Sequence, residues 1–218
     1  MTFSSCLTDE DSALALDASV VINLLATGYP TSILKALAVP IVVVDNVVQE
    51  IERGATNGRQ EIDLLARMID ERIVRVVELE GEALQMFFGL VSGSASESLG
   101  DGEAATLAFA RGMGCVAAID EKKATRLAAD RFGSLRLVTT VDILAHDAVR
   151  TSVGDALLAD AAFQALRVAR MQVREHQFDW IVRTIGEENV ANCSSLRRLA
   201  ARRSAGLFKQ ATMSFELK

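Results

Sequence analysis

The sequence predicts an α/β fold: a three-layer α/β/α sandwich around a central, mainly parallel sheet of four or five strands, with a C-terminal helical extension. Short β-branched apolar runs alternate with longer segments of helical spacing over the first two thirds of the chain. Such alternation requires crossover connections, which place helices on both faces of a parallel sheet. Strand patterns cease after about Thr151. We therefore expect one domain over residues 1–150 and a helical extension, residues 151–218, packed on it.

The strand candidates are short apolar runs rich in Val and Ile, a composition typical of strands that helices cover on both faces. In chain order they are Ala13–Leu16, Ile41–Val44, Ile73–Val77, Cys115–Ile119 and Leu135–Val138.

Helical spacing fills the intervals between these runs and continues after them. The expected helices are Val20–Ala26, Thr31–Ala38, Val47–Gly54, Gly58–Glu71, Gly81–Val91, Glu103–Gly112, Glu121–Phe132, Val153–Gln172, Glu175–Ile185 and Asn192–Lys209. The clearest loop is the Ser- and Gly-rich segment Val91–Gly102, which leads into the helix that carries Glu103.

Composition limits the classes of function. The 218 residues, half of them apolar, suffice for one α/β domain with a sizeable core and an appendage. A net charge of −6 argues against a protein that coats nucleic acid through positive charge, but an acidic metal site would itself contribute negative charge. Three scattered cysteines predict free thiols. With no export signal and no apolar run long enough to cross a bilayer, we expect a cytoplasmic protein without a membrane partner.

Acidic residues recur where apolar segments give way to helices. They are Asp17, Glu50, Glu103 with the nearby Asp101, and Asp120. Sites in parallel sheets form beyond the carboxyl ends of the strands, so these side chains are expected to converge there. Converging carboxylates repel one another unless a cation joins them, and Mg²⁺ or Mn²⁺ takes oxygen ligands. The pattern therefore predicts a divalent-metal site suited to phosphodiester hydrolysis.

Each of these acids also has a purely structural explanation. Asp17, Asp101 and Asp120 precede helices, and Asp is a preferred N-cap. Glu103 in a first helical turn favours the helix dipole, whereas Glu50 near the end of its helix gains no such benefit. Capping alone does not require an acid at every strand exit, so the joint pattern favours a shared site.

Three segments, LALDASVVINLL, VVVDNVVQEIERG and LGDGEAATLAFARGMGCVAAIDEKKATRLAADRF, resemble the motifs of the PIN-domain family in their usual order. This family comprises metal-dependent ribonucleases and includes VapC-like toxins. The resemblance covers roughly Leu14–Ala148. It implies a PIN-like fold, Mg²⁺ or Mn²⁺ as cofactor, and hydrolysis of RNA by a metal-activated water.

The resemblance assigns roles to single residues. Asp17, Glu50, Glu103 and Asp120 match the four catalytic acids in order. Asp17 and Asp120 would bind the metal directly, while Glu50 and Glu103 would complete its shell or orient the attacking water. Asp101 has two open roles, a metal contact through water or a helix cap.

Polar neighbours of these acids are candidates to support them through hydrogen bonds. Ser19 lies beside the first Asp, although a helix-start role fits it equally well, and Thr139 and Thr140 follow the fifth strand. Asp142, one turn later, is expected to cap the next helix.

Two basic segments are candidates to bind nucleic acid, because their positive charge suits phosphates. They contain Lys122, Lys123 and Arg126 after the fourth acid, and Arg197, Arg198, Arg202 and Arg203 near the C-terminus. A solvated helix face is the alternative for both segments. The second segment could also dock on the acidic domain or on another subunit.

The leading hypothesis is a metal-dependent endoribonuclease with an RNA substrate, and the toxin of a toxin–antitoxin pair is one form that it could take. An antitoxin and a homodimeric partner are compatible with the family. The C-terminal extension departs from compact toxins and weakens the toxin assignment more than the nuclease assignment. A nucleic-acid-binding or regulatory PIN-like protein with weak or no catalysis is the alternative, and a metal-dependent phosphatase or flap-type DNA nuclease is a third.

Overall fold

The computed structural model describes residues 3–54, 59–92, 94 and 97–215, and a parallel five-stranded sheet lies at its centre. The strand order is β3-β2-β1-β4-β5, and every neighbouring pair is parallel. The strands are β1 (Leu14–Leu16), β2 (Ile41–Val44), β3 (Val74–Val77), β4 (Val116–Ala118) and β5 (Leu137–Val138). Each lies within the range that the sequence predicted, and the predicted parallel α/β sheet is confirmed.

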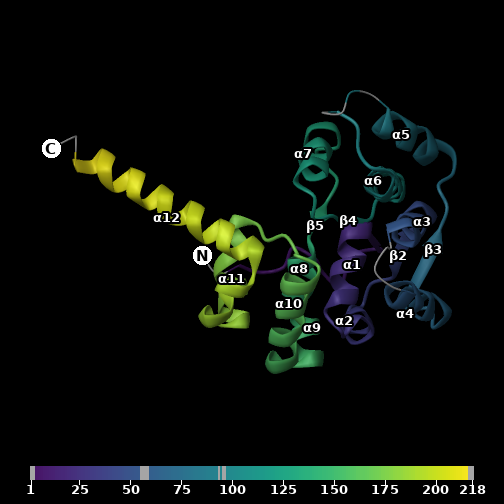
Figure 1. The fold of residues 1–218 in the computed structure, drawn as a ribbon. Helices are drawn as coiled ribbons and strands as arrows, with labels where there is room; N and C mark the ends of the chain where they lie inside the picture. Colours follow the sequence, from purple (N-terminus) through teal and green to yellow (C-terminus); the bar gives the residue numbers. More distant parts are fainter. Residues whose placement is uncertain (1–2, 55–58, 93, 95–96, 216–218) are drawn as a thin grey trace.

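Helices connect the strands and follow the last one (Figure 1). Those of the strand-containing region are α1 (Ala18–Ala26), α2 (Pro30–Ala36), α3 (Asp45–Gly54), α4 (Arg59–Asp70), α5 (Gly81–Val91), α6 (Asp101–Met113) and α7 (Lys122–Arg131). After β5 come α8 (Thr140–Leu144), α9 (Asp147–Val153), α10 (Asp155–Val168), the 3-10 turn η1 (Glu175–Gln177), α11 (Phe178–Ile185), the 3-10 turn η2 (Glu187–Asn192) and α12 (Ser194–Phe215).

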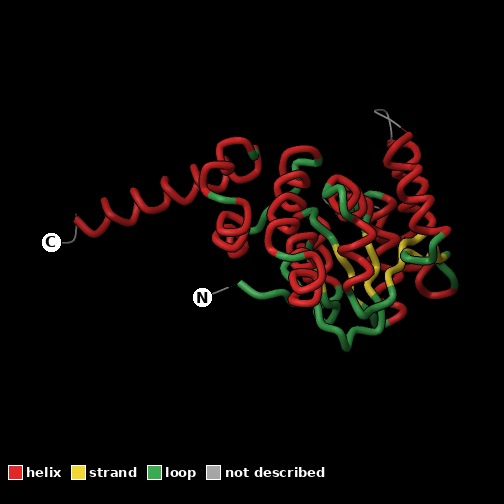
Figure 2. The backbone as a smooth tube through the Cα atoms, turned by 90° about the horizontal axis from the view of Figure 1, so that it is seen from below, coloured by secondary structure: helices red, strands yellow, loops and turns green. Residues whose placement is uncertain are grey.

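Alternate strand residues divide the interior into two cores, one on each face of the sheet. On β1, Leu14 and Leu16 pack with α1, α2, α4 and the helices after β5, whereas Ala15 packs with α5, α6 and α7. Figure 2 shows the strands, in yellow, enclosed between helices. Because both faces are covered, the strands can be apolar along their whole length. The three-layer α/β/α arrangement follows directly from these two cores.

The helices after β5 complete one layer of this sandwich. Leu158, Ala162 and Leu166 of α10 belong to the same buried cluster as Leu14 and Leu16 of β1. The last helix, α12, starts on this layer and then extends away from the body (Figures 1 and 2). The predicted helical extension is thus present and packed on the sheet. Its status as a domain separate from residues 1–150 stays a prediction.

One predicted helix is wrong in its extent. The chain does not form a single helix over Val153–Gln172, because α9 ends at Val153 and α10 begins at Asp155 and ends at Val168. Gly154 separates the two helices with a φ of 77°, a left-handed value that interrupts the helix and that glycine adopts without strain. Residue 58, predicted to start a helix, and residues 93, 95 and 96 of the predicted loop lie outside the described residues.

Two predictions from composition can be compared with the described part of the chain. Cys6, Cys115 and Cys193 are free thiols, the first exposed and the other two buried. None of the described helices has the length and apolar character needed to cross a membrane.

Because α10 packs on the sheet, we expect Leu166→Ala to lower the stability of the fold strongly. Leu166 is fully buried, so its truncation is expected to lower the free energy of unfolding by about 2–5 kcal/mol through lost burial and a residual cavity. Urea titration followed by circular dichroism measures this. Val168→Ala is the matched control on the same helix, since Val168 is 59% exposed, and its effect is expected within about 0.5 kcal/mol. Equal stabilities of the two variants would contradict the packing described here.

Candidate functional site

Asp17 lies directly after β1, the middle strand of the sheet. Its backbone N–H donates to the Ala118 carbonyl at 3.1 Å, which ties the end of β1 to the end of β4. As N-cap of α1, its Oδ2 accepts from the Ser19 hydroxyl at 2.7 Å and from the Ser19 N–H at 3.3 Å. The other oxygen, Oδ1, is buried and has no hydrogen-bond partner. Buried polar atoms are nearly always satisfied, so this open acceptor points to a ligand.

Glu50 approaches Asp17 through the start of α6. Its Oε2 accepts from the Gly102 N–H at 3.1 Å, a bond that joins α3 to α6. A Cβ at Gly102 would overlap the Glu50 carboxylate and would lie 3.5 Å from Asp17 Oδ1. A side chain here would therefore displace the acids. No sequence pattern indicated this role of Gly102, although it lies between two of the predicted site residues, Asp101 and Glu103.

Glu103 is the third acid of this cluster. Its Oε2 accepts from the Gly100 N–H at 3.3 Å, so the carboxylate also stabilises the start of α6. The pKa of Glu103 is raised to about 7, mainly by burial and next by the charge of Asp17. The hydrogen bond from Gly100 opposes this shift, and the charges of Glu121 and Glu50 add smaller contributions to it. The structure thus brings Asp17, Glu50 and Glu103 into electrostatic contact.

Burial likewise raises the pKa of Asp17, to about 6. The hydrogen bonds from Ser19 and the Ala18 N–H oppose this shift, and the charge of Glu50 adds to it. The carboxylate is only 2% exposed, so its charge is poorly solvated. A cation beside Oδ1 would favour the ionised form.

Asp120 follows β4, the neighbour of β1, and its carboxylate is held on two sides. Oδ1 accepts from the Thr140 N–H at 2.9 Å, and Oδ2 accepts from the Thr140 hydroxyl at 2.5 Å and from Asn23 Nδ2 at 2.6 Å. Burial raises the pKa of Asp120, while these hydrogen bonds lower it. The N-cap interpretation is wrong for this residue, because Glu121 occupies the N-cap position of α7. Asn23 was missed, although it is a lone amide within an apolar helix.

Arg174, from the segment before η1, fixes the backbone next to this carboxylate. Its Nη2 donates to the Asp120 carbonyl at 3.0 Å and to the Thr125 hydroxyl at 2.9 Å. The guanidinium also lowers the pKa of the Asp120 carboxyl. The C-terminal third therefore contributes directly to the surroundings of the fourth acid, which no sequence pattern suggested.

The remaining polar candidates fall in different places. Thr140 contacts Asp120, but the Thr139 hydroxyl donates to Asp142 at 2.6 Å and accepts from Gln177 Nε2 at 2.8 Å. Thr139 and Asp142 together cap α8, so the capping role predicted for Asp142 is confirmed. Thr139 thus supports the start of α8 rather than the carboxylate of Asp120.

Asp101 is the first residue of α6, and its side chain is exposed. Gly100 is the N-cap, so the capping role considered for Asp101 is not observed. A metal contact through water stays a prediction for this residue.

The donor atoms at the carboxyl ends of the strands are of the type that a hard divalent cation prefers. They are carboxylate oxygens, one of them buried without a partner, and Asp120 Oδ1 retains an acceptor position because it accepts one hydrogen bond. Within the described ranges, however, no three His, Cys, Asp or Glu side chains form a ready group for a metal ion. Asp17, Glu103 and Asp120 are the residues that could hold one, with Glu50 next to them.

The basic residues predicted to bind nucleic acid lie on two surfaces, except for Arg203, which forms an ion pair. Lys122 meets Arg198 and Arg202 in a depression of about 110 Å³. Arg197 lines a neighbouring depression, while Arg126 is exposed and Lys123 half-buried on α7.

Arg203 is engaged within the protein. Its guanidinium forms an ion pair with Asp179 at 2.7 Å and lies 4.8 Å from the centre of the Phe178 ring. Arg203 thus links α12 to α11, which differs from the role predicted for it.

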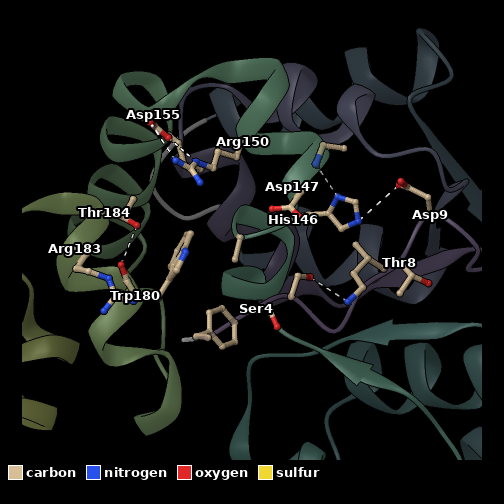
Figure 3. A pocket seen from close by; sticks show the side chains of 16 residues that line it. Ser4, Thr8, Asp9, His146, Asp147, Arg150, Asp155, Trp180, Arg183 and Thr184 are labelled. Atoms are coloured by element: carbon tan, nitrogen blue, oxygen red, sulfur yellow. Dashed lines mark hydrogen bonds and ion pairs between the residues drawn. The ribbon is translucent and has the colours of Figure 1, made fainter. Parts of the chain in front are cut away.

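A cavity of about 780 Å³ is present elsewhere in the protein, and Figure 3 shows its lining. The N-terminal segment and residues of α9, α10 and α11 line it, and none of the four acids does. Four of its charged groups form two pairs. Arg150 contacts Asp155 at 2.7 Å, and His146 lies 3.7 Å from Asp9. The cavity therefore offers no obvious chemistry for phosphodiester hydrolysis.

The raised pKa of Asp17 predicts a pH-dependent stability. Between the ordinary value of 3.8 and about 6, the folded state binds more protons than the unfolded state, so stability falls as pH rises through this window. Asp17→Asn removes this cost. In EDTA above about pH 7, the free energy of unfolding of the variant is expected to exceed that of the parent by on the order of 1–3 kcal/mol. Near pH 4 the two free energies are expected to be equal. Urea titrations across this pH range measure the difference, with Asp101→Asn as the exposed control.

Addition of Mg²⁺ provides the second arm of this experiment. A cation that binds only the folded parent stabilises it. The difference in free energy of unfolding between the parent and Asp17→Asn should therefore become smaller when Mg²⁺ is added. A gap that is independent of both pH and Mg²⁺ would contradict a buried, metal-binding carboxylate at this position.

The hydroxyl of Thr140 is predicted to stabilise the fold through Asp120. Thr140→Val keeps the shape but leaves the buried carboxylate without its hydroxyl donor, at a cost of about 1–3 kcal/mol. Thr151→Val, at an exposed position of α9, is the control. Thermal unfolding of both variants tests the point, and equal melting temperatures would count against it.

A comparison with protein families agrees with this geometry. A family model described as a PIN domain matches residues 13–187, which is more than half of the chain and contains all four acids. No curated protein matches the chain. The match extends past residue 150 and includes α10, η1 and α11. The chain therefore belongs to the PIN-domain family, a family of nucleases.

Proposed function

We propose that this protein is a divalent-metal-dependent endoribonuclease that hydrolyses RNA phosphodiester bonds with a metal-activated water. The main support is the buried Oδ1 of Asp17, which lacks a partner and lies close to Glu50 and Glu103. An unsatisfied buried carboxylate oxygen carries a large desolvation cost, which Mg²⁺ or Mn²⁺ would offset. The oxygen-only character of the site favours these hard cations over zinc.

The acids have distinct proposed roles. Asp17, Glu103 and Asp120 would hold the cation, which when bound would lower the pKa of a water and offset charge on the phosphate. Asp101, exposed at the start of α6, would contact it through water. Glu50 lies beside Asp17 and would complete the shell. As an alternative to binding the cation, Glu103 would orient the attacking water as general base.

Neighbouring donors fix the carboxylates before substrate arrives. Ser19 holds Oδ2 of Asp17, which leaves Oδ1 directed elsewhere. Thr140 and Asn23 hold Asp120 from α8 and α1. Partners of this kind orient metal-binding carboxylates, and their loss typically lowers metal affinity or activity by about 10–100-fold.

The proposal predicts loss of cleavage in Asp17→Asn and Glu103→Gln. In Mn²⁺, the rate at which each variant cleaves a labelled single-stranded RNA is expected to be at least about 100-fold lower than that of the parent, because a charged oxygen donor is removed. Gel analysis of the products measures the rates. EDTA should abolish cleavage by the parent.

Asp130→Asn serves as the control, since Asp130 is exposed on α7 away from these acids. Circular dichroism confirms that each variant is folded. Parent-like cleavage by folded Asp17→Asn would show that the acids do not form the active site.

A second function is favoured by one observation. No three acidic, His or Cys side chains among the described residues form a ready metal-binding group. This arrangement would also fit a PIN-like protein that binds nucleic acid, or regulates, with weak or no catalysis. RNA binding in EDTA without cleavage in Mn²⁺ or Mg²⁺ would support this function over the first.

The toxin role is a narrower form of the same proposal, with an antitoxin protein and a second copy of the chain as partners. It requires that expression arrests growth through RNA cleavage, and that Asp17→Asn relieves the arrest. A small DNA-binding protein encoded next to this chain would be the expected antitoxin.

A further inference from the structure

A second buried polar atom lacks a partner, and it lies outside the acidic cluster. Among the described side chains, the buried nitrogen and oxygen atoms without a hydrogen bond are Asp17 Oδ1 and Ser195 Oγ. Ser195 is 6% exposed at the start of α12 and lines the depression of about 110 Å³ introduced above. A hydroxyl held in this way has an unused donor and unused acceptors.

Three cations line the same depression. Lys122 comes from the first turn of α7, while Arg198 and Arg202 are four residues apart and share one face of α12. In the part of the chain that the structure describes, no carboxylate pairs with any of them. The protein as a whole is acidic, with 29 acidic and 23 basic residues, whereas this depression is lined by basic side chains and no acidic one. Their mutual repulsion would be relieved by an anion.

Two other arginines, Arg150 and Arg203, differ in this respect. Arg150, in the large cavity, pairs with Asp155, and Arg203, one residue after Arg202, pairs with Asp179. The charges of those arginines are neutralised within the fold. The depression therefore combines a hydroxyl without a partner and cations without counter-charges.

The depression lies next to the fourth acid. Lys122 follows Asp120 by two residues, and Gln172 and Val173 also line the depression. The next residue, Arg174, donates to the Asp120 carbonyl. The same short segment thus borders the depression and holds the end of β4, so a strand of nucleic acid at Asp120 would extend toward α12.

We propose that this depression is a phosphate-binding subsite for the RNA strand, occupied by a phosphate that flanks the one to be cleaved. Lys122, Arg198 and Arg202 supply positive charge, and the Ser195 hydroxyl donates a hydrogen bond to a phosphate oxygen. The subsite rests on the proposed nuclease function, because it assigns the substrate a path from Asp120 to α12.

A neighbouring depression suggests the direction of that path. Arg198 also lines it, together with Arg197 and Arg170. Positive side chains therefore continue along the first turns of α12 beyond the proposed subsite.

Binding of a labelled single-stranded RNA in EDTA, followed by fluorescence anisotropy at several salt concentrations, tests the subsite without cleavage. The double variant Arg198→Ala/Arg202→Ala is expected to bind about tenfold more weakly. Its plot of log Kd against log salt should lose a slope of roughly 0.7 for each phosphate contact removed. Arg75→Ala is the control, because Arg75 is exposed on β3 at the opposite edge of the sheet.

Ser195→Ala distinguishes a role of the hydroxyl in RNA binding from a role in stability. Removal of an unpartnered buried hydroxyl should leave the melting temperature unchanged or raise it, whereas RNA affinity should fall about threefold or more. Inorganic phosphate should compete with RNA on the parent and compete less well on the double variant. Parent-like RNA affinity and salt slope in both variants would overturn the proposal, as would a site that takes inorganic phosphate without any effect on RNA.

Cleavage in Mn²⁺ distinguishes this proposal from the nuclease function. The double variant should raise KM and leave kcat unchanged, because a flanking phosphate is bound equally in the ground and transition states. A dinucleotide substrate, which lacks a flanking phosphate, should be cut equally by variant and parent. Folded Asp17→Asn that still cuts RNA refutes the catalytic assignment, whereas a double variant with an unchanged KM refutes the subsite alone.

Discussion

Burial of a carboxylate at the end of a central parallel strand is the constraint on which the site depends. Asp17 leaves β1 between β2 and β4, where helices on both faces exclude water. Its charge cannot be solvated there, and the cap of α1 satisfies one of its oxygens. The crossover helices α3 and α6 then bring Glu50 and Glu103 to the same edge. Parallel topology thus concentrates negative charge where solvation is weakest.

Capping and metal binding are compatible roles in this structure, although the sequence presents them as alternatives. Asp17 caps α1 with one oxygen and leaves the other open, and Glu103 closes the start of α6 while it contributes to the acidic cluster. The local hydrogen bonds fix each carboxylate in one orientation. A helix terminus can therefore hold a functional group rigidly, because the cap that stabilises the helix also limits the side chain to one rotamer.

The strands, their parallel arrangement and the presence of acids at strand exits could be predicted from the sequence, because β-branched runs and strand exits are local patterns. The partners of those acids could not. Asn23 meets Asp120 across 97 residues, and Arg174 meets it across 54. No local sequence pattern indicates that Gly102 lies against the Glu50 carboxylate or that the Ser195 hydroxyl is buried without a partner. The helix predicted over Val153–Gln172 began one residue before the break at Gly154, and α9, which precedes that break, was not predicted. The cap considered for Asp120 failed because tertiary contacts with Thr140 replaced the local one.

The contact between Arg174 and the β4–α7 turn has a consequence for the architecture of the molecule. A shortened chain that ended after β5 would retain every acid but lose the guanidinium that anchors the turn beside one of them. It would also expose the face of the sheet that α10 covers. The contacts that hold the turn beside Asp120 therefore extend at least to Arg174, and α10 forms part of the α/β/α sandwich itself.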